Sequence, residues 1–247
     1  MARVLCIANQ KGGVGKTTTA VNLAVGLAKA GCRTLLVDFD PQCNATSSLG
    51  CQPTPRHPLV ERKPFRESLR TTACEALELL PGSRSFADVE ALSDEDGDAN
   101  VLKRHLWGSV NVYDFVLLDC PPSLGRMTEA ALAASTEVLM PIQCEYFAME
   151  GLTQMIQVIR RVMKRQANRL QFGGIVLTMY DPSLELTREV EAEVRDFFGD
   201  VVFDTVVPRD VAVAEAPSHA KSVLDYAPRA RGARAYLELC LEVLERD

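Results

Sequence analysis

Apolar runs alternate with amphipathic segments along almost the whole chain of 247 residues. Strands are expected in the apolar runs, at residues 3–9, 34–39, 76–80, 115–119, 137–142, 172–178 and 201–207. Helices are expected in the amphipathic segments, at residues 16–30, 128–134, 150–169, 188–198 and 232–246. Because strands that are buried on both faces have continuous apolar runs, this pattern predicts an α/β fold. We expect a doubly wound, mostly parallel sheet with helices on both faces.

Two segments depart from this pattern. Residues 50–70 carry several prolines and charges without a clear period, so they are predicted to form a surface excursion. Residues 93–100 are acidic and contain glycine, which predicts a loop. The sequence has no internal repeat and no linker that would divide it. We therefore expect a single domain over residues 1–247.

Composition limits the classes of partner. Hydrophobic residues make up 47% of the chain and the formal net charge is −6, so any DNA contact must come from a local basic patch. The eight cysteines show no C-x-x-C pair and no metal spacing with histidine, and the first residues do not form a secretion signal. No apolar run approaches the length that spans a bilayer. We expect a cytoplasmic protein with reduced thiols and no membrane partner.

A glycine-rich loop joins the first expected strand to the first expected helix. This order predicts a phosphate-binding loop, because glycines let backbone N–H groups surround phosphate oxygens at a helix N-terminus. Lys16 is expected to reach the β- and γ-phosphates, and the Thr17 hydroxyl to bind Mg²⁺. The residues expected to contact the nucleotide are Lys11, Gly12, Gly13, Val14, Gly15, Lys16, Thr17 and Thr18. The predicted fold is therefore of the P-loop NTPase type.

Carboxylates follow two further expected strands, at the edge where function collects in open α/β sheets. Asp40 is expected to position the attacking water beside Mg²⁺, and Asp38 to make hydrogen bonds that hold the loop. Asp119 ends an apolar run, a pattern in which the carboxylate reaches Mg²⁺ directly or through water. No strong general base is evident. We therefore expect slow, Mg²⁺-dependent hydrolysis with weak basal activity, in which Lys16 and Asp40 are catalytic.

The loop departs from the ordinary pattern G-x-x-x-x-G-K-[ST], because Gln10 replaces the first glycine and a second lysine, Lys11, precedes Gly12. It resembles the deviant Walker A loop of the ParA/MinD superfamily. Seven stretches together resemble ParA/Soj-type chromosome or plasmid partition ATPases: residues 7–23, 38–42, 118–125, 141–151, 177–182, 214–219 and 230–233. The resemblance covers nearly the whole chain, and residues 50–70 and 93–100 match poorly.

The resemblance implies a nucleotide switch. Two subunits would close over two ATP molecules, each lending Lys11 to the partner's nucleotide as a further catalytic residue. This ATP-bound homodimer would bind double-stranded DNA without sequence preference and so associate with the nucleoid. A ParB-type centromere-binding partner would stimulate hydrolysis. Pro208 and Asp210 stand where members of the family contact the adenine.

Six basic residues are the main candidates for contacts with DNA phosphates: Arg188, Arg209, Lys221, Arg229, Arg231 and Arg234. The basic stretch Arg160, Arg161, Lys164 and Arg165 is a further candidate. Relatives usually have Asn in place of Asp210 and often Arg in place of Ala212. The added anion and the missing cation weaken the electrostatic attraction to DNA. Relatives also tend to have Gly in place of Cys43, which is expected to reshape its loop slightly.

Other functions stay open at this stage. A MinD-like membrane-cycling ATPase would need a basic amphipathic C-terminal helix, whereas residues 235–247 are amphipathic but acidic, so their apolar face is expected to pack on the domain. A reductase of the nitrogenase-iron-protein type would hold an iron–sulfur cluster between subunits, and Cys120 and Cys144 lie near the required elements. Amidoligases with similar loops normally carry extra substrate domains, for which this length leaves no room. A positioning adaptor would use ATP only to dimerise and would carry another cargo.

Overall fold

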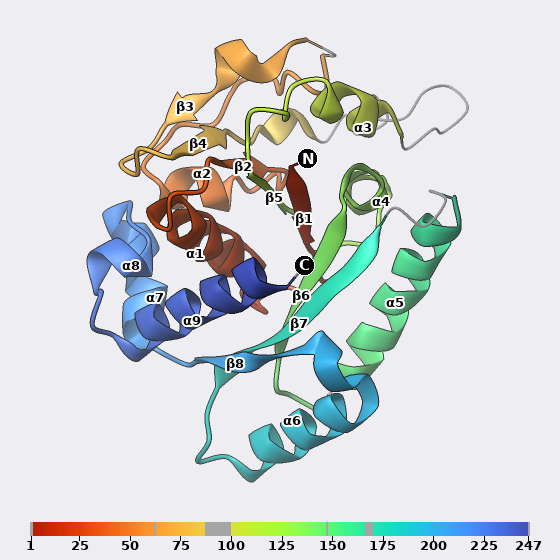
Figure 1. The fold of residues 1–247 in the computed structure, drawn as a ribbon, viewed down its shortest axis with the longest axis vertical. Coiled ribbons are helices and arrows are strands. Elements are labelled where there is room, and N and C mark those ends of the chain that lie inside the picture. The colour runs from red at the N-terminus through yellow and green to blue at the C-terminus, as the bar shows by residue number, and fades with distance from the viewer. Residues whose placement is uncertain (1, 62, 87–99, 147, 166–169, 247) are drawn as a thin grey trace.

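The computed structural model describes residues 2–61, 63–86, 100–146, 148–165 and 170–246. Its strands are β1 (Arg3–Ile7), β2 (Thr34–Asp38), β3 (Arg70–Thr71), β4 (Leu77–Leu80), β5 (Phe115–Asp119), β6 (Glu137–Gln143), β7 (Gln171–Tyr180) and β8 (Val202–Pro208). They form one sheet in the order β3-β4-β2-β5-β1-β6-β7-β8 (Figure 1). Each neighbouring pair is parallel except β3 and β4. The prediction of a mostly parallel sheet is confirmed.

The helices include every one that the sequence predicts, with ends that differ by a few residues, and the predicted helical residues 166–169 lie outside the described residues. They are α1 (Lys16–Lys29), α2 (Asn44–Ser48), α3 (Asn100–Trp107), α4 (Arg126–Ala134), α5 (Ala148–Arg165), α6 (Glu185–Phe198), α7 (Val211–Glu215), α8 (Val223–Tyr226) and α9 (Arg231–Glu245), with 3₁₀ helices η1 (Phe65–Ser68), η3 (Gly199–Val201) and η4 (Ala216–His219). The helices α2, α3, α7 and α8 were not predicted, because segments of four to eight residues are too short to show a clear period. The predicted loop at residues 93–100 lies outside the described residues except for Asn100, which begins α3.

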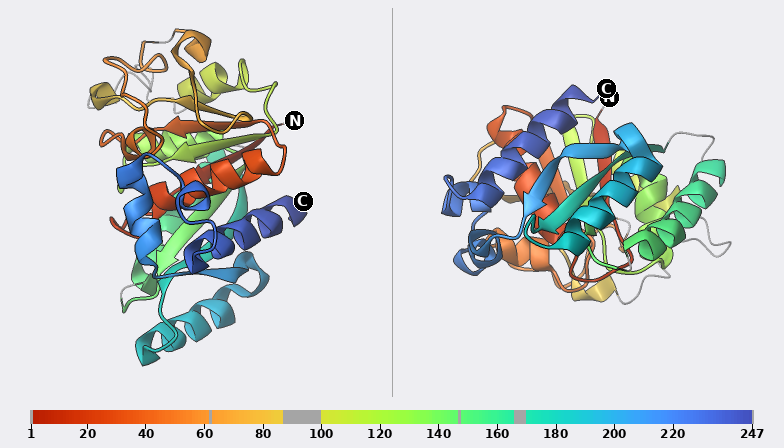
Figure 2. Two further views of the ribbon diagram at one scale, coloured as in Figure 1. Left: turned by 90° about the vertical axis from the view of Figure 1, so that its left-hand side faces the viewer. Right: turned by 90° about the horizontal axis from the view of Figure 1, so that it is seen from below.

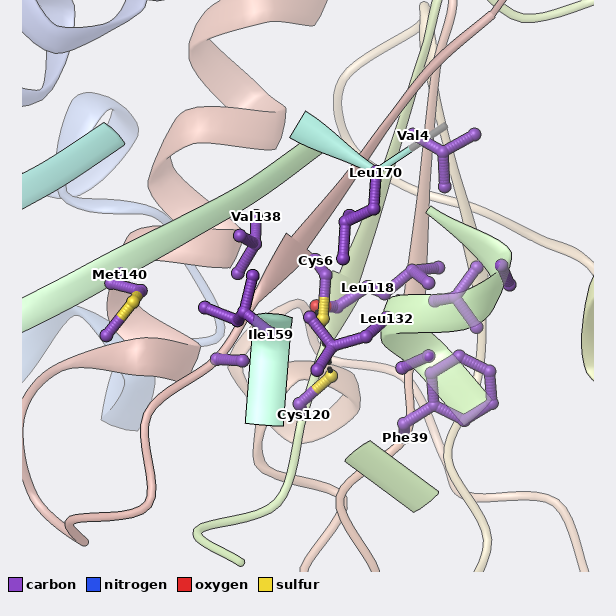
Figure 3. Packing of buried hydrophobic residues seen from close by; sticks show 14 of the residues in the cluster. Val4, Cys6, Phe39, Leu118, Cys120, Leu132, Val138, Met140, Ile159 and Leu170 are labelled. Carbon is purple, nitrogen blue, oxygen red and sulfur yellow. Dashed lines mark hydrogen bonds between the residues drawn. The ribbon is translucent and has the colours of Figure 1, made fainter. Parts of the chain in front are cut away.

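The sheet separates two hydrophobic cores. Side chains alternate along a strand, so Leu5 and Ile7 of β1 face the core formed with α1, α8 and α9. Val4 and Cys6 face the opposite core, which contains side chains of α3, α4, α5 and α6. Figure 2 shows helices on both sides of the sheet, and Figure 3 shows part of the second core around Cys6. This arrangement confirms the doubly wound fold.

The last helix, α9, packs against α1. Tyr236 is buried and its hydroxyl lies 3.3 Å from Thr19 Oγ1. A Cβ atom added to Gly26 would lie 2.2 Å from Cys240 Sγ, so the two helices touch where glycine leaves room. This contact confirms that the apolar face of the C-terminal segment packs on the domain. Across the described ranges, no helix combines the length and apolar character that crossing a membrane requires.

Residues 50–70 are not simply a surface excursion. His57, Leu59 and Phe65 in this segment are buried. The His57 ring packs against Phe39 and Phe86, with ring centroids 6.0 and 4.4 Å away. The prediction is therefore wrong for this part of the segment. Single apolar and aromatic side chains anchor the segment to the sheet, and isolated anchors leave no helical or strand period in the sequence.

Candidate functional site

The predicted phosphate-binding loop forms the turn between β1 and α1. Gly13 and Gly15 have φ angles of 76° and 86°. These lie in the left-handed region, where any other residue is strained, and this explains the glycines. Gly15 is also the residue that caps the N-terminus of α1, so the free N–H groups of the first helical turn border the loop.

Two side chains that the sequence analysis did not identify fix this loop. Asn9 donates from Nδ2 to the Pro141 carbonyl at 2.8 Å, and its Oδ1 accepts from the Lys11 N–H at 3.0 Å. Thr178 at the end of β7 donates from Oγ1 to the Val14 carbonyl at 2.9 Å. Asn9 follows β1 and Thr178 lies near the C-terminal end of β7, and this position was the signal that could have identified them.

A groove of about 300 Å³ lies over the loop. It brings together most of the predicted phosphate-binding residues with four that were not predicted, Gln42, Asn44, Pro122 and Met179. Its lining comprises Gly12, Gly13, Gly15, Lys16, Thr17, Thr18, Asp40, Gln42, Asn44, Pro122 and Met179. The side chain of Val14 is buried instead, so only its backbone is available to a ligand.

The two lysines of the loop point to different places. Lys16 is buried and its Nζ donates to the Lys11 carbonyl at 2.9 Å. Burial lowers the pKa of Lys16, and the charges of Asp119 and Asp40 oppose this change. The Lys11 side chain instead forms an ion pair with Glu145, Nζ to Oε2 2.5 Å. It lines a neighbouring cavity of about 520 Å³ and does not line the groove.

Two aspartates end adjacent strands in register. Asp38 of β2 pairs with Asp119 of β5. The Asp38 carboxylate accepts from Thr46 N–H at 2.9 Å, from Thr46 Oγ1 at 2.6 Å and from Asp40 N–H at 3.2 Å. Thr46 Oγ1 in turn accepts from the Gly82 N–H at 2.8 Å. These bonds confirm the prediction that Asp38 holds the loop.

Asp119 has the opposite environment. It is fully buried, and neither carboxylate oxygen has a hydrogen-bond partner among the described residues. Burial raises the pKa of Asp119 well above its ordinary value and the nearby Asp38 charge raises it further, whereas the nearby Thr17 hydroxyl and the Lys16 charge act in the opposite direction. Buried polar atoms without partners are costly, so these oxygens have free lone pairs for a ligand that is not a protein group.

The side chains at this site could supply some of the oxygen ligands of a Mg²⁺ ion. Asp119 offers unpartnered oxygens, and Thr17 and Asp40 line the groove above it. Within the described part of the chain, no group of three or more His, Cys, Asp or Glu side chains forms a complete metal site. Beside a nucleotide, water and phosphate supply most of the ligands of Mg²⁺, so a few protein oxygens suffice.

A second cavity of about 190 Å³ adjoins the groove and includes Pro208 and Asp210. Asp210 caps α7, because its Oδ1 accepts from the Ala212 N–H at 2.9 Å. Its Oδ2 accepts from the Gly232 N–H at the start of α9, also at 2.9 Å. Asp210 therefore joins these two helices at the wall of the cavity.

The six candidate DNA-binding residues all have exposed side chains. Arg209, Lys221, Arg229, Arg231 and Arg234 belong to the segment between β8 and the first turns of α9, whereas Arg188 lies on α6. Hydrogen bonds from Ser183 lower the pKa of Asp181, and Arg209 and Arg231 add to this effect, so both arginines lie near one carboxylate. Five of the six candidates therefore lie in one continuous segment of the chain, and Arg188 lies outside it.

The cysteines do not suit a cluster at a subunit surface. Cys120 and Cys6 are fully buried with their sulfurs 3.4 Å apart, inside the core that Figure 3 shows. Cys144 is also buried. Their placement argues against the reductase alternative. Cys43 has a left-handed φ of 56° at the start of α2, a conformation that favours glycine.

Comparisons with known proteins agree over the whole chain. A family model described as an AAA domain matches residues 2–172. The chromosome-partitioning ATPase Soj of Treponema pallidum is 46% identical over 100% of this chain and 99% of its own length. The chromosome partitioning protein ParA of Caulobacter vibrioides is 43% identical over 99% of this chain and 95% of its own.

A solved structure adds a correction. Cobyrinic acid a,c-diamide synthase from Mycobacterium smegmatis, with bound ADP and magnesium, superposes with a TM-score of 0.85 at 34% identity. The match covers 99% of this chain and 95% of that one, so the argument that chain length excludes such enzymes is wrong. The higher identity to the partitioning proteins decides between the two groups. The chain belongs to the ParA/Soj family of partition ATPases.

Proposed function

We propose that this protein is an ATP-dependent dimerisation switch that hydrolyses ATP slowly and positions chromosome or plasmid DNA with a ParB-type partner. The observation that carries the proposal is the different placement of the two lysines. Lys16 is buried in the groove, whereas the Lys11 ammonium group lies outside it beside Glu145. When a second subunit faces this surface, the Lys11 ammonium group of each subunit would reach the nucleotide bound to the other.

The groove supplies contacts suited to a triphosphate with Mg²⁺. Backbone N–H groups of the loop and Lys16 would hold the phosphates, and Thr17, Asp40 and Asp119 would hold the ion. When bound, ATP with Mg²⁺ supplies the phosphoryl group that is transferred to water. Asp40 would orient that water, since its Oδ1 is fixed by the Gln42 N–H at 2.9 Å. Without a strong general base, this arrangement supports slow turnover.

Binding of double-stranded DNA and association with the nucleoid would use the exposed cations between β8 and α9. Each subunit has a net charge of −6, so DNA would be attracted only by a local patch, and a dimer that places both sets of these cations on one face would enlarge that patch. DNA affinity should therefore depend on ATP and fall steeply with salt concentration. The curated relatives are named for chromosome partitioning, which supports this cargo.

The proposal is tested by light scattering after gel filtration, with and without ATP and Mg²⁺. Wild-type protein is expected to dimerise only with ATP. Lys16→Ala should bind ATP about 100-fold more weakly, because it removes a charged phosphate contact. Lys11→Ala should bind ATP normally but neither dimerise nor hydrolyse it. Lys63→Ala, which removes an exposed lysine that does not line the groove, is the matched control and should behave as wild type.

A Lys11→Ala variant that dimerises and hydrolyses ATP at the wild-type rate would contradict the switch. DNA retention is measured on the same samples at increasing salt. An ATP-dependent dimer that fails to bind duplex DNA even at low salt would instead identify an ATPase that positions another cargo, the alternative that the sequence left open.

A further inference from the structure

Two of the candidate DNA-binding arginines lie at the C-terminal end of β7, although both are distant from it in sequence. The Arg209 N–H donates to the Tyr180 carbonyl at 3.0 Å, which fixes Arg209 beside the last residue of that strand. The next residue, Asp210, accepts from the Gly232 N–H at 2.9 Å, and this bond brings Arg231 at the start of α9 to the same place. Both arginine side chains are exposed. They therefore form one small basic patch.

Asp181, the residue that follows β7, adds a carboxylate to this patch. Its Oδ1 accepts from the Ser183 N–H at 3.0 Å and from the Ser183 hydroxyl at 2.6 Å. Because serine is neutral, these bonds orient the carboxylate without cancelling its charge. The bonds from Ser183 lower the pKa of Asp181, and the charges of Arg209 and Arg231 lower it further. Asp181 is therefore ionised beside the two arginines at neutral pH.

Asp181 differs in this respect from Asp210, the anion that the sequence analysis expected to weaken the attraction to DNA. The Asp210 oxygens accept from the Ala212 and Gly232 N–H groups, in the first turns of α7 and α9. The positive end of a helix dipole offsets part of a carboxylate charge at such a position. The Asp181 charge is offset by the arginines themselves, which are the groups that DNA would need.

We propose that Asp181 competes with DNA phosphates for Arg209 and Arg231, and thereby limits the affinity of the ATP-bound protein for duplex DNA. A guanidinium group binds carboxylate and phosphate oxygens with the same geometry, so one contact excludes the other. Because these groups are exposed, the competition is weak and tunes DNA affinity without abolishing it. This inference rests on the proposed DNA binding and adds a residue that opposes it.

The test measures the fluorescence anisotropy of a labelled duplex of arbitrary sequence. The full chain is loaded with Mg²⁺ and a non-hydrolysable ATP analogue, and the salt concentration is varied. Asp181→Asn removes the charge but keeps the oxygen that Ser183 bonds, so the turn is preserved. It should tighten DNA binding about threefold at low salt. The slope of log Kd against log salt should steepen by about one, because about one more phosphate contact forms. Affinity for the ATP analogue should not change, since Asp181 lines neither the groove nor the adjoining cavity.

Asp196→Asn is the matched control, because Asp196 is exposed near the C-terminal end of α6 and its loss changes the net charge equally. This control should leave DNA affinity and the salt slope unchanged. In a variant with both Arg209→Gln and Arg231→Gln, adding Asp181→Asn should give no further gain.

Equal gains in Asp181→Asn and Asp196→Asn would refute the competition, since net charge alone would then explain them. A gain that persists without the two arginines, or a loss of affinity in Asp181→Asn, would refute it as well. Each of these outcomes leaves DNA binding itself intact. If neither wild type nor Asp181→Asn bound the duplex at low salt, the proposed DNA binding would fail together with the inference.

Discussion

Replacing Asp119 by Asn is expected to stabilise the ligand-free protein and to abolish the Mg²⁺-dependent binding of nucleotide. Both Asp119 oxygens are buried without a hydrogen-bond partner among the described residues, and burial raises the pKa of the carboxyl. A buried carboxylate without a hydrogen-bond partner costs about 2 kcal/mol, which the nearby Lys16 charge offsets in part, and a neutral amide of the same size avoids most of this cost. For a chain of this length, that change raises Tm by about 4–8 °C.

The assay is thermal unfolding followed by circular dichroism, in a chelator and again with Mg²⁺ and ADP. Asp38→Asn is the matched control, because Asp38 is the register partner of Asp119 but accepts three hydrogen bonds. Asp38→Asn should therefore lower Tm in the chelator, whereas Asp119→Asn should raise it. The ADP-induced rise in Tm that depends on Mg²⁺ should vanish in Asp119→Asn. If Asp119→Asn lowered Tm as much as Asp38→Asn, or kept the Mg²⁺-dependent rise, the reasoning from the free oxygens would be wrong.

Two further predictions concern stability outside the groove. Burial lowers the pKa of His57 from 6.5 to about 3, so the folded state excludes a proton that the unfolded chain binds. The contribution of neutral His57 to the free energy of unfolding is fully present above pH 6.5 and is smaller by about 2 kcal/mol at pH 5. Urea unfolding at both pH values measures this loss, which His57→Asn should reduce; an equal loss in that variant would exclude His57 as its source. Gly26→Ala should destabilise the protein by about 1–3 kcal/mol, because the new Cβ meets Cys240 Sγ. Adding Cys240→Ala to Gly26→Ala should recover part of the loss in the same assay, and a purely additive double variant would argue against that clash.

Local patterns predicted the residues of the candidate site that belong to short motifs. The glycines of the loop, Lys16 and the strand-ending Asp119 could be identified because each follows an apolar run and belongs to a short motif. Asn9, Thr178 and Met179 were missed, since their roles arise from hydrogen bonds and cavities that join distant segments. Their location at the ends of parallel strands was the available signal.

The fold was predicted well for the buried strands and less well for segments that only single buried side chains attach to the core. Continuous apolar runs located the strands that form the centre of the sheet, and parallel burial explains why. The segment at residues 50–70 was misjudged because His57 and Phe65 are buried through tertiary contacts that no period reveals. Asp210 was predicted to contact a base, but its two oxygens also cap helices, a role that depends on α9 returning to α7.

The ion pair between Lys11 and Glu145 determines how readily the proposed switch can act. Its side chains are 37% and 47% exposed, so solvent screens the attraction and the pair contributes at most about 1 kcal/mol. A nucleotide phosphate presented by a second subunit carries more negative charge than one carboxylate and would be desolvated by the closing interface, which strengthens its attraction for Lys11. The pair therefore holds Lys11 outside its own groove without opposing transfer to a partner. A more deeply buried pair would keep the lysine in place and prevent this exchange, since breaking it would leave an uncompensated buried charge.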